Sequence, residues 1–445
     1  MKNSNTNHLS RRQFLGYSAL GLTGLTILPS WTLADGTRMA PSDRVVLGFI
    51  GVGQQGISDF GSFTGCPGVQ VAAGCDVDSL KRERFKRRVE AWQKRQNMGQ
   101  RCDTYEFYED LLNRKDIDAV SIATPDHWHA LNLIHACRAK KDVYVQKPLS
   151  YTITEGHDMV KAARDNKCVV QVGSQQRSSK EFQQAIALVR SGSIGHIETV
   201  YVRVGDPPST YDLPEMSVPE TLNFNQWLGP LNDPKVHYHT DICLPISLDP
   251  EKNETQWARW RYYRETGNGF TADWGTHMFD ITQAALGMDG SGPCEFIPKG
   301  FGGAKYLTMK YQNGIVMTEQ NYRPNDGGQG ICFNGTKGWL RVARGYIECS
   351  NASLLKKDEQ SIAEKDYVMS SPHMQDFIDC VRSRKQPIAP VEVGSSSLTV
   401  CCIANIAIEL QRPVKWDPAT LSFGDDKEAL NHRLYRYQYR KPYSI

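Results

Sequence analysis

One stretch near the start of the sequence decides the fold: Arg44-Val45-Val46-Leu47-Gly48-Phe49-Ile50, followed directly by Gly51-Val52-Gly53-Gln54-Gln55-Gly56. The apolar run predicts a buried β-strand, and the glycine cluster predicts a tight turn that opens a helix. In such a turn the first glycine permits the bend, the second lets the backbone approach a pyrophosphate, and the third lets the helix pack on the strand. The diphosphate would then bind at the positive helix N-terminus. A purely structural glycine turn is the alternative.

An acidic residue stands where a dinucleotide site requires one. Asp76 follows the second predicted strand, residues 69–75, and lies about 20 residues after the last glycine of the motif. A carboxylate at that place bonds the ribose 2′-hydroxyl, and Asp78 adds a second negative charge that disfavours a 2′-phosphate. We therefore predict NAD as the cofactor, with NADP less favoured. The predicted contacts come from the glycine loop and this acid: Gly51, Gly53, Gln54, Gln55, Gly56 and Asp76.

Strands and helices alternate along the first part of the chain. Further buried strands are predicted at 117–123, 142–145 and 169–172, with helices at 79–97, 128–139 and 153–166. This alternation predicts an α/β fold that begins with a doubly wound Rossmann domain. After about residue 180 short strands follow one another, at 195–204, 306–311, 315–322, 330–334 and 338–342. They predict a C-terminal α+β domain with a large open, mainly antiparallel sheet.

The N-terminus has the features of an export signal. Ser10-Arg11-Arg12-Gln13-Phe14-Leu15-Gly16 is a twin-arginine pattern, an apolar segment follows at 17–28, and Thr32-Leu33-Ala34 offers small residues for cleavage. We expect residues 1–34 to be a twin-arginine signal peptide and the protein to be exported to the periplasm. An uncleaved anchor or a chance arginine pair is the alternative. The predicted domains are then 35–175 for the nucleotide, 176–372 for the substrate and 373–445 for closing helices and a tail.

Composition narrows the classes of partner. The sequence has 445 residues with 52 basic and 49 acidic side chains, and a net charge of +3 is too balanced to indicate nucleic acid. Beyond the signal, no segment reaches the ~20 apolar residues of a membrane span. The 12 cysteines include no C-x-x-C spacing, so we interpret most as core residues. No metal is expected, because His237 and His239 near Asp241 lack a third ligand.

Two further stretches carry a family resemblance: Ala123-Thr124-Pro125-Asp126-His127-Trp128-His129 and Val145-Gln146-Lys147-Pro148-Leu149. With the glycine motif they resemble the Gfo/Idh/MocA oxidoreductases, which usually have Glu-Lys-Pro at the end of the fourth strand. The resemblance implies that Lys147 is the catalytic lysine beside the nicotinamide and that Pro148 sets the turn. It also implies cofactor contacts from Thr124, Pro125, His127, His129, Gln146 and Lys147. Gln146 replaces the usual glutamate, which removes any role that needs a carboxylate there but keeps the hydrogen bonds of an amide.

A third family element lies within Gly267-Asn268-Gly269-Phe270-Thr271-Ala272-Asp273-Trp274-Gly275-Thr276-His277. The family places an aspartate and, four residues later, a histidine on one helix, and Asp273 and His277 match that pattern. A spacing of four puts both side chains on one helical face. The resemblance implies that His277 accepts a hydroxyl proton and that Asp273 orients the ring or bonds a substrate hydroxyl. Without the family match, a structural pair would be the favoured interpretation.

Four residues are predicted to bind substrate: Arg177, Trp260, Arg261 and Trp274. Sugars present apolar C–H faces that stack on aromatic rings, and hydroxyls that bond arginine and aspartate. Core packing is the equal alternative for each aromatic residue, and an ordinary surface ion pair is the equal alternative for Arg177.

The sequence leaves three functions open. The first is a sugar or polyol dehydrogenase, resembling secreted glucoside 3-dehydrogenases, in which tightly bound NAD accepts hydride. The second is a redox-neutral glycoside hydrolase or lyase that oxidises C3 transiently, which would suit an exported protein without a free nicotinamide pool. Retention of Lys147, Asp273 and His277 favours the first, because NAD-dependent glycosidases lack that lysine. The third is a binding protein on a retired enzyme scaffold. A homo-oligomer is expected by analogy only.

Overall fold

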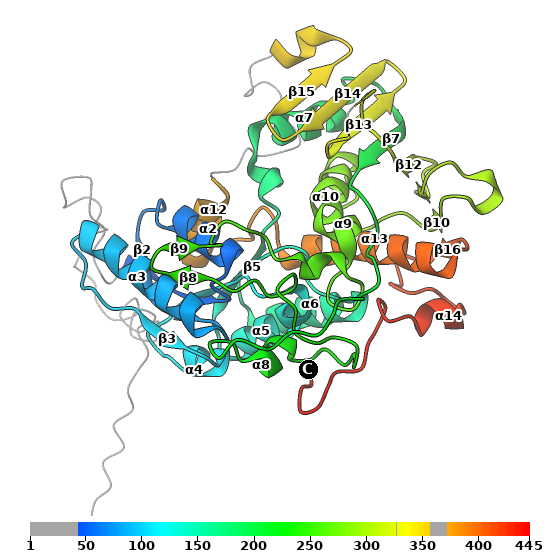
Figure 1. The fold of residues 1–445 in the computed structure, drawn as a ribbon. Helices are drawn as coiled ribbons and strands as arrows, with labels where there is room; N and C mark the ends of the chain where they lie inside the picture. Colours follow the sequence, from blue (N-terminus) through cyan, green and yellow to red (C-terminus); the bar gives the residue numbers. More distant parts are fainter. Residues whose placement is uncertain (1–42, 326, 357–371) are drawn as a thin grey trace, which may run out of the picture. The chain divides into compact units, whose positions relative to one another are not determined.

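A six-stranded parallel sheet forms one half of the structure, a computed structural model that describes residues 43–325, 327–356 and 372–445 (Figure 1). Its strand order is β3-β2-β1-β4-β5-β6, so the order reverses direction beside β1 as in a doubly wound sheet. The strands are β1 (Val45–Ile50), β2 (Val69–Cys75), β3 (Asp103–Tyr105), β4 (Ala119–Ile122), β5 (Asp142–Val145) and β6 (Val170–Val172). The predicted Rossmann domain is confirmed. The predicted signal peptide lies outside the described residues.

Helices cover both faces of this sheet, and the strand sequences explain why. Along β1, Val45, Leu47 and Phe49 belong to one core cluster, whereas Val46 and Ile50 belong to another. Because successive side chains point to opposite faces, a strand that is apolar throughout must be covered on both sides. The covering helices are α2 (Gln54–Phe63), α3 (Ser79–Arg95), α4 (Tyr108–Leu112), α5 (Asp126–Arg138) and α6 (Ile153–Asn166).

The second half is built on an eight-stranded sheet of order β15-β14-β13-β7-β12-β11-β10-β16. All its pairings are antiparallel except β7 with β12, which confirms the prediction of a mainly antiparallel sheet. Its strands are β7 (Ile197–Arg203), β10 (Glu295–Ile297), β11 (Thr308–Lys310), β12 (Val316–Glu319), β13 (Gly330–Gly335), β14 (Gly338–Ala343), β15 (Tyr346–Cys349) and β16 (Val414–Lys415). Helices α7 (Lys180–Arg190), α10 (Gly275–Leu286) and α13 (Val391–Leu410) pack on it (Figure 1).

Helix α13 is the one helix among the described residues that is long and apolar enough to cross a membrane. Most of it is buried inside the fold, where it packs against α6 and α10. Cys401 and Cys402 lie on it and are fully buried. Ten of the twelve cysteines are buried and all are free thiols, which confirms their interpretation as core residues.

Short elements complete the described chain. They are η3 (Gln175–Ser178), α8 (Phe224–Leu228), β8 (Ser247–Leu248), β9 (Glu251–Lys252), η4 (Arg259–Tyr262), α9 (Gly269–Asp273), η5 (Phe301–Gly303), η6 (Ala352–Lys356), α12 (His373–Ser383) and α14 (Lys427–Leu430). The C-terminal part serves both halves: Phe377 on α12 packs its ring against Phe63 and Tyr144 of the Rossmann half, whereas α13 lies in the other core. The predicted domain boundaries stay a prediction.

Candidate active site

One cavity of about 1380 Å³ opens where β1, β2, β4 and β5 end. Pockets for one small ligand measure about 300–1,000 Å³, so this cavity has room for a dinucleotide and a second molecule. Its far wall comes from η4, α9 and the start of α10. The cavity therefore joins the glycine loop, the Lys-Pro turn and the Asp-to-His helix pattern in one space.

The glycine loop has the geometry of a phosphate cradle. Gly51 has φ +82°, and a Cβ there would lie 2.7 Å from the backbone of Ala123 and Thr124. A Cβ on Gly56 would lie 2.1 Å from the carbonyl oxygen of Gly51, so the helix packs tightly on the turn. Gly53, in contrast, has no atom within 4 Å of that position, and it caps α2 without a side-chain hydrogen bond. The open space beside Gly53 and the uncapped backbone amides at the start of α2 fit a diphosphate.

Asp76 is held in place at the end of β2 by two backbone amides. Its carboxylate accepts hydrogen bonds from the N–H groups of Val52 and Asp78, each at 3.0 Å. Lys81 and Arg84 line the same end of the cavity. These two cations offset the negative charges of Asp76 and Asp78, so the charge pattern alone gives weaker support for NAD over NADP than the sequence suggested.

Lys147 and Asp273 form the charged centre of the cavity. Lys147 Nζ lies 2.5 Å from Asp273 Oδ1 and 3.0 Å from the main-chain oxygen of Asp273, and the Lys147–Pro148 peptide bond is cis. Burial disfavours the charged carboxylate, but Lys147 and then Arg261 outweigh it and hold the pKa of Asp273 below its ordinary value. The pair unites the two halves of the fold, because Lys147 follows β5 and Asp273 ends α9.

The Nε2 atom of His277 is occupied by a neighbouring side chain and does not face open space. Its Nε2 lies 3.1 Å from Nη2 of Arg344, and a guanidinium only donates, so Nε2 accepts and Nδ1 carries the proton. Burial first, and then Lys147 and Arg344, hold the pKa of His277 well below its ordinary value. The imidazole is therefore neutral, with its acceptor occupied by Arg344. The sequence analysis missed Arg344, which directly follows β14 and lines the cavity.

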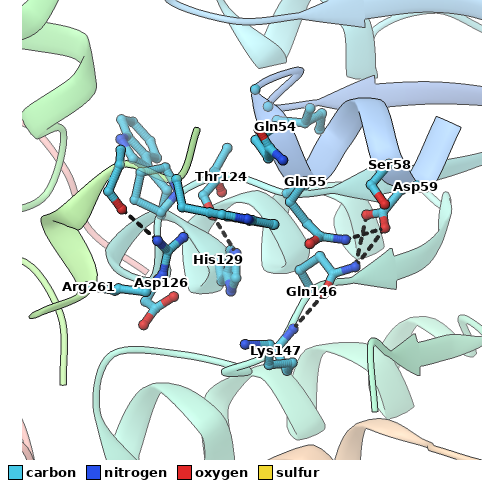
Figure 2. Close-up of a pocket in the computed structure, with 18 of the residues that line it drawn as sticks. Gln54, Gln55, Ser58, Asp59, Thr124, Asp126, His129, Gln146, Lys147 and Arg261 are labelled. Carbon is cyan, nitrogen blue, oxygen red and sulfur yellow. Dashed lines mark hydrogen bonds between the residues drawn. The ribbon is translucent and has the colours of Figure 1, made fainter. Parts of the chain in front are cut away.

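Gln146 binds a carboxyl that the sequence analysis also missed. Its Nε2 donates to both oxygens of Asp59, at 2.8 and 3.0 Å, and Gln55 Nε2 donates to the same group at 2.7 Å (Figure 2). Asp59 is 1% exposed, and burial raises the pKa of its carboxyl to about 7 despite these two amides. A second buried acid, Asp126, lines the cavity near Lys147, and burial raises its pKa to about 8.

Three predicted site residues do not line the cavity: Gly56, which packs the start of α2 against the turn, His127 and Arg177. His127 is fully buried and its Nε2 lies 3.0 Å from the carbonyl oxygen of Trp227, so the predicted cofactor contact is corrected to a core contact. Arg177 is 2% exposed and pairs with Asp280 at 2.8 Å and Asp289 at 2.5 Å. It joins η3 to α10 as a buried ion pair, which is neither the predicted substrate contact nor a surface pair.

The other predicted residues do border the cavity: Gly51, Gly53, Gln54, Gln55, Asp76, Thr124, Pro125, His129, Gln146, Lys147, Trp260, Arg261, Asp273, Trp274 and His277. His129 lies 2.8 Å from the carbonyl oxygens of both Thr124 and Pro148, so it ties the two motif turns together. Arg261 stacks between the rings of Trp257 and Trp260 and lies 3.9 Å from Asp273 Oδ1. Trp257 is half exposed and was missed by the sequence analysis.

No cluster of three or more His, Cys, Asp or Glu side chains with metal-site geometry occurs in the part of the chain that the structure describes. His237 Nε2 lies 2.7 Å from the carbonyl oxygen of Leu213, and His239 Nδ1 accepts from the backbone N–H of Asp241. Both rings are thus engaged with the backbone of their own loop.

Comparison with known proteins settles the family. A family model described as oxidoreductase family, NAD-binding Rossmann fold, matches residues 45–174, and a second, described as oxidoreductase family, C-terminal alpha/beta domain, matches residues 208–445. The chain belongs to the Gfo/Idh/MocA oxidoreductase family. This Gfo/Idh/MocA protein therefore has a Rossmann domain of the NAD-binding type, as its motifs predicted.

The curated relatives match only part of this Gfo/Idh/MocA protein. A glycosyl hydrolase family 109 protein from Shewanella pealeana is 31% identical over 211 residues, or 44% of this chain and 46% of the relative. An alpha-N-acetylgalactosaminidase from Shewanella oneidensis is 29% identical over 204 residues, or 45% of this chain and 41% of the relative. The match thus spans less than half the length of either relative.

Solved structures share the fold over nearly their whole length. An aldose-aldose oxidoreductase from Caulobacter crescentus has a TM-score of 0.54 at 16% identity, covering 84% of this chain and 99% of that one. The WlbA dehydrogenase from Bordetella pertussis, solved with NADH and UDP-GlcNAcA, has a TM-score of 0.58 at 18% identity, covering 84% and 98%. At these identities the likeness concerns the fold alone.

Proposed function

We propose that this protein is an NAD-dependent oxidoreductase that transfers hydride between a hydroxyl-bearing carbon of a sugar or glycoside and tightly bound NAD. The observation that carries the proposal is the Lys147–Asp273 pair, 2.5 Å apart, in the cavity that the glycine loop opens. A lysine and a carboxylate placed beside a nucleotide cradle are the groups that proton transfer from a hydroxyl requires.

The residues present fit the nucleotide. Gly51, Gly53 and the first turn of α2 would hold the diphosphate, and Asp76 would bond a ribose hydroxyl. Gln54 supports this fit, because its buried Oε1 has no hydrogen-bond partner in the protein. Bound NAD would supply the hydride acceptor, and the protein must supply everything else.

The proton path follows from the contacts of Lys147. Its Nζ donates a short hydrogen bond to Asp273 Oδ1, so the carboxylate orients the amine. A neutral Nζ held in this way can accept the proton of a substrate hydroxyl as the carbonyl forms. His277 does not serve as this acceptor while Arg344 occupies its Nε2. We therefore propose that Lys147, oriented by Asp273, is the proton relay, and that His277 has a role in orientation.

The aromatic wall supports a sugar as the substrate. Trp257, Trp260 and Trp274 line the cavity on the side opposite the glycine loop, and Arg261 is stacked between two of them. Indole faces bind the C–H faces of pyranose rings, and fixed guanidinium groups bond their hydroxyls. Core packing does not account for Trp257, which is 50% exposed.

A second function is favoured by the curated relatives. Two of them carry glycosidase names, so a redox-neutral glycoside hydrolase or lyase that oxidises C3 transiently is the alternative. Oxidation at C3 acidifies the C2 hydrogen, and a base would then remove it before the glycosidic group leaves. Both functions need the same nucleotide and the same wall. They differ in whether the glycosidic bond is broken and in whether hydride returns to the sugar.

One experiment separates these functions. Purified protein is denatured and any released nucleotide is identified by mass and absorbance, and the intact protein is then incubated with a panel of glycosides while absorbance is followed at 340 nm. Bound NAD that a glycoside reduces supports the dehydrogenase. Bound NAD with released sugar and no lasting absorbance change supports the glycosidase. Protein that holds no nucleotide and binds none would refute both, leaving a binding protein.

We further propose that the protein is exported through the twin-arginine pathway, because the Arg11-Arg12 pattern is followed by an apolar segment. Export of the folded, NAD-loaded protein would explain a cofactor that does not exchange. Fractionation of cells expressing the native chain and an Arg11→Lys/Arg12→Lys variant checks this proposal. Periplasmic location of both proteins, or of neither, would contradict it. Size-exclusion chromatography with light scattering checks the expected homo-oligomer.

A further inference from the structure

Arg344 is a cation in the cavity without a carboxylate partner. Within the described parts of the chain, no acidic side chain lies within ion-pair distance of its guanidinium. The guanidinium stacks 4.5 Å from the centre of the Trp274 ring and donates to His277 Nε2 at 3.1 Å. The side-chain amide of Gln176 satisfies both its nitrogen and its oxygen in one orientation. In that orientation its oxygen accepts a hydrogen bond from Arg344 Nε at 3.1 Å. Neutral groups thus fix its position, and the carboxylate of Asp273 opposes its charge only from beyond ion-pair distance.

Other arginines of the same region are neutralised. Arg177, below the cavity wall, binds two aspartates, and Arg341, three residues before Arg344 on β14, pairs with Glu348 at 3.2 Å and stacks on Trp339. These two arginines thus have acidic partners and do not line the cavity. Arg344 differs because it lines the cavity and has no acidic side chain within ion-pair distance among the described residues.

The surrounding groups add positive charge rather than remove it. Lys147 and Arg261 already share the carboxylate of Asp273, at 2.5 and 3.9 Å. Asp126 lines the same space, but burial raises its pKa to about 8, so it is protonated at neutral pH. Glu181 also lines the cavity, and it accepts a hydrogen bond from the backbone N–H of Gly345. Lys147, Arg261 and Arg344 thus outnumber Asp273 and Glu181, which leaves a positive surplus at the substrate end.

We propose that Arg344 binds an anionic group of the substrate, and that this group is the carboxylate of a sugar acid, such as a hexuronic acid or its glycoside. The inference deepens the proposed function and rests on it. A guanidinium whose face lies on an indole presents its edge, and that edge matches a planar carboxylate with two parallel hydrogen bonds. The surplus charge at this end of the cavity would be balanced by the ligand.

The guanidinium has donors to spare for such a ligand. Of its five N–H groups, His277 Nε2 and the Gln176 amide engage two. A carboxylate can bind the remaining N–H groups while the neutral partners hold the arginine in place.

The test compares two matched sugars on the NAD-loaded protein, methyl glucuronide and methyl glucoside, which differ by a carboxylate in place of a CH₂OH group. Binding is measured by calorimetry and by the fluorescence of the tryptophans. We expect the glucuronide to bind about 10- to 100-fold more tightly, as a charge-assisted pair of hydrogen bonds predicts. Arg344→Gln should abolish this preference, and Arg344→Lys should retain only part of it because the fork is lost.

Arg341→Gln is the matched control, because it removes an arginine three residues away, on β14 but outside the cavity, and it should keep the full preference. Thermal unfolding and bound nucleotide confirm that each variant is folded and loaded. Equal binding of the two sugars, or a preference that survives Arg344→Gln, would overturn the inference. Tighter binding of glucose 6-phosphate than of the glucuronide would overturn the choice of a carboxylate. Reduction of bound NAD at 340 nm is read separately, so a failure here leaves the test of the oxidoreductase intact.

Discussion

Replacing one atom of the Lys147–Asp273 pair should reveal whether it is the proton relay. Asp273→Asn keeps the shape of the side chain but removes the carboxylate that faces Lys147 Nζ at 2.5 Å and Arg261 at 3.9 Å. Without this carboxylate the proton acceptor, Lys147 Nζ, loses its position, and loss of a positioned general base lowers turnover by about 10²–10⁴-fold. We expect that loss in the single-turnover reduction of bound NAD by its sugar, with the nucleotide retained.

The stability of the variant gives a second measure. Removing one partner of a buried ion pair costs about 3–5 kcal/mol. The two side chains are still 17% and 19% exposed, so we expect a loss just below this range, about 2–3 kcal/mol, in the free energy of unfolding. Because the pKa of Asp273 is lowered in the folded state, its stabilisation is present above the unfolded pKa of about 3.9 and is lost as the pH falls through the folded pKa. Urea unfolding at pH 7 therefore measures the full effect.

The control is Asp241→Asn, which breaks an exposed pair with Arg259 at 3.3 Å. Such a pair contributes about 0–1 kcal/mol, and turnover should not change. The relay would be refuted if Asp273→Asn retained turnover within about threefold of the native protein, a loss far smaller than a missing general base produces. Loss of bound NAD in this variant would instead assign Asp273 to the cofactor site.

Three other predictions concern the nucleotide end and the cavity wall. Burial raises the pKa of Asp59 to about 7, so the folded protein keeps a proton that the unfolded chain releases near pH 4. The free energy of unfolding therefore falls as the pH rises from about 4 to 7. Asp59→Asn should flatten that fall in thermal unfolding at pH 5, 7 and 9, and parallel curves for both proteins would contradict it. Gly53→Ala should keep native stability but lose NAD, because its Cβ meets no protein atom. Gly51→Ala should lose both stability and NAD. If Gly53→Ala retained NAD, the proposed phosphate site at this loop would be wrong. Trp257→Ala should raise KM about tenfold with little change in kcat, as expected when a stacking contact made equally in the ground and transition states is lost, and an unchanged KM would exclude it as a sugar platform.

The elements that the sequence predicts well are those with a local signal. Strand β1 is apolar at every position and is followed by glycines with a strict spacing, so both the strand and its turn could be predicted from neighbouring residues. Lys147 and Asp273 were found because each belongs to a short motif. Their contact across 126 residues could not be derived from either motif alone.

The residues that were missed or misplaced have a physical reason in common. Arg344 meets His277 from a strand 67 residues away, and Asp59 meets Gln146 across 87 residues, so no local periodicity marks either contact. His127 is a different case, because residues two apart on a helix point in nearly opposite directions. With His129 facing the cavity, His127 had to face the core, and that correction was available from the sequence.

The departure at Gln146 makes physical sense once Asp59 is placed. A glutamate in that position would put two carboxyls within hydrogen-bond distance in a buried space, where both cannot be ionised together. The amide removes the conflict and donates to Asp59 instead, with Gln55 supplying the second donor. Asp59 in the middle of α2 thus places a carboxyl beside the end of β5, where the amide of Gln146 binds it. As a result, Lys147 is left with Asp273 as its ion-pair partner among the described residues, which makes that pair the point where its proton is held or released.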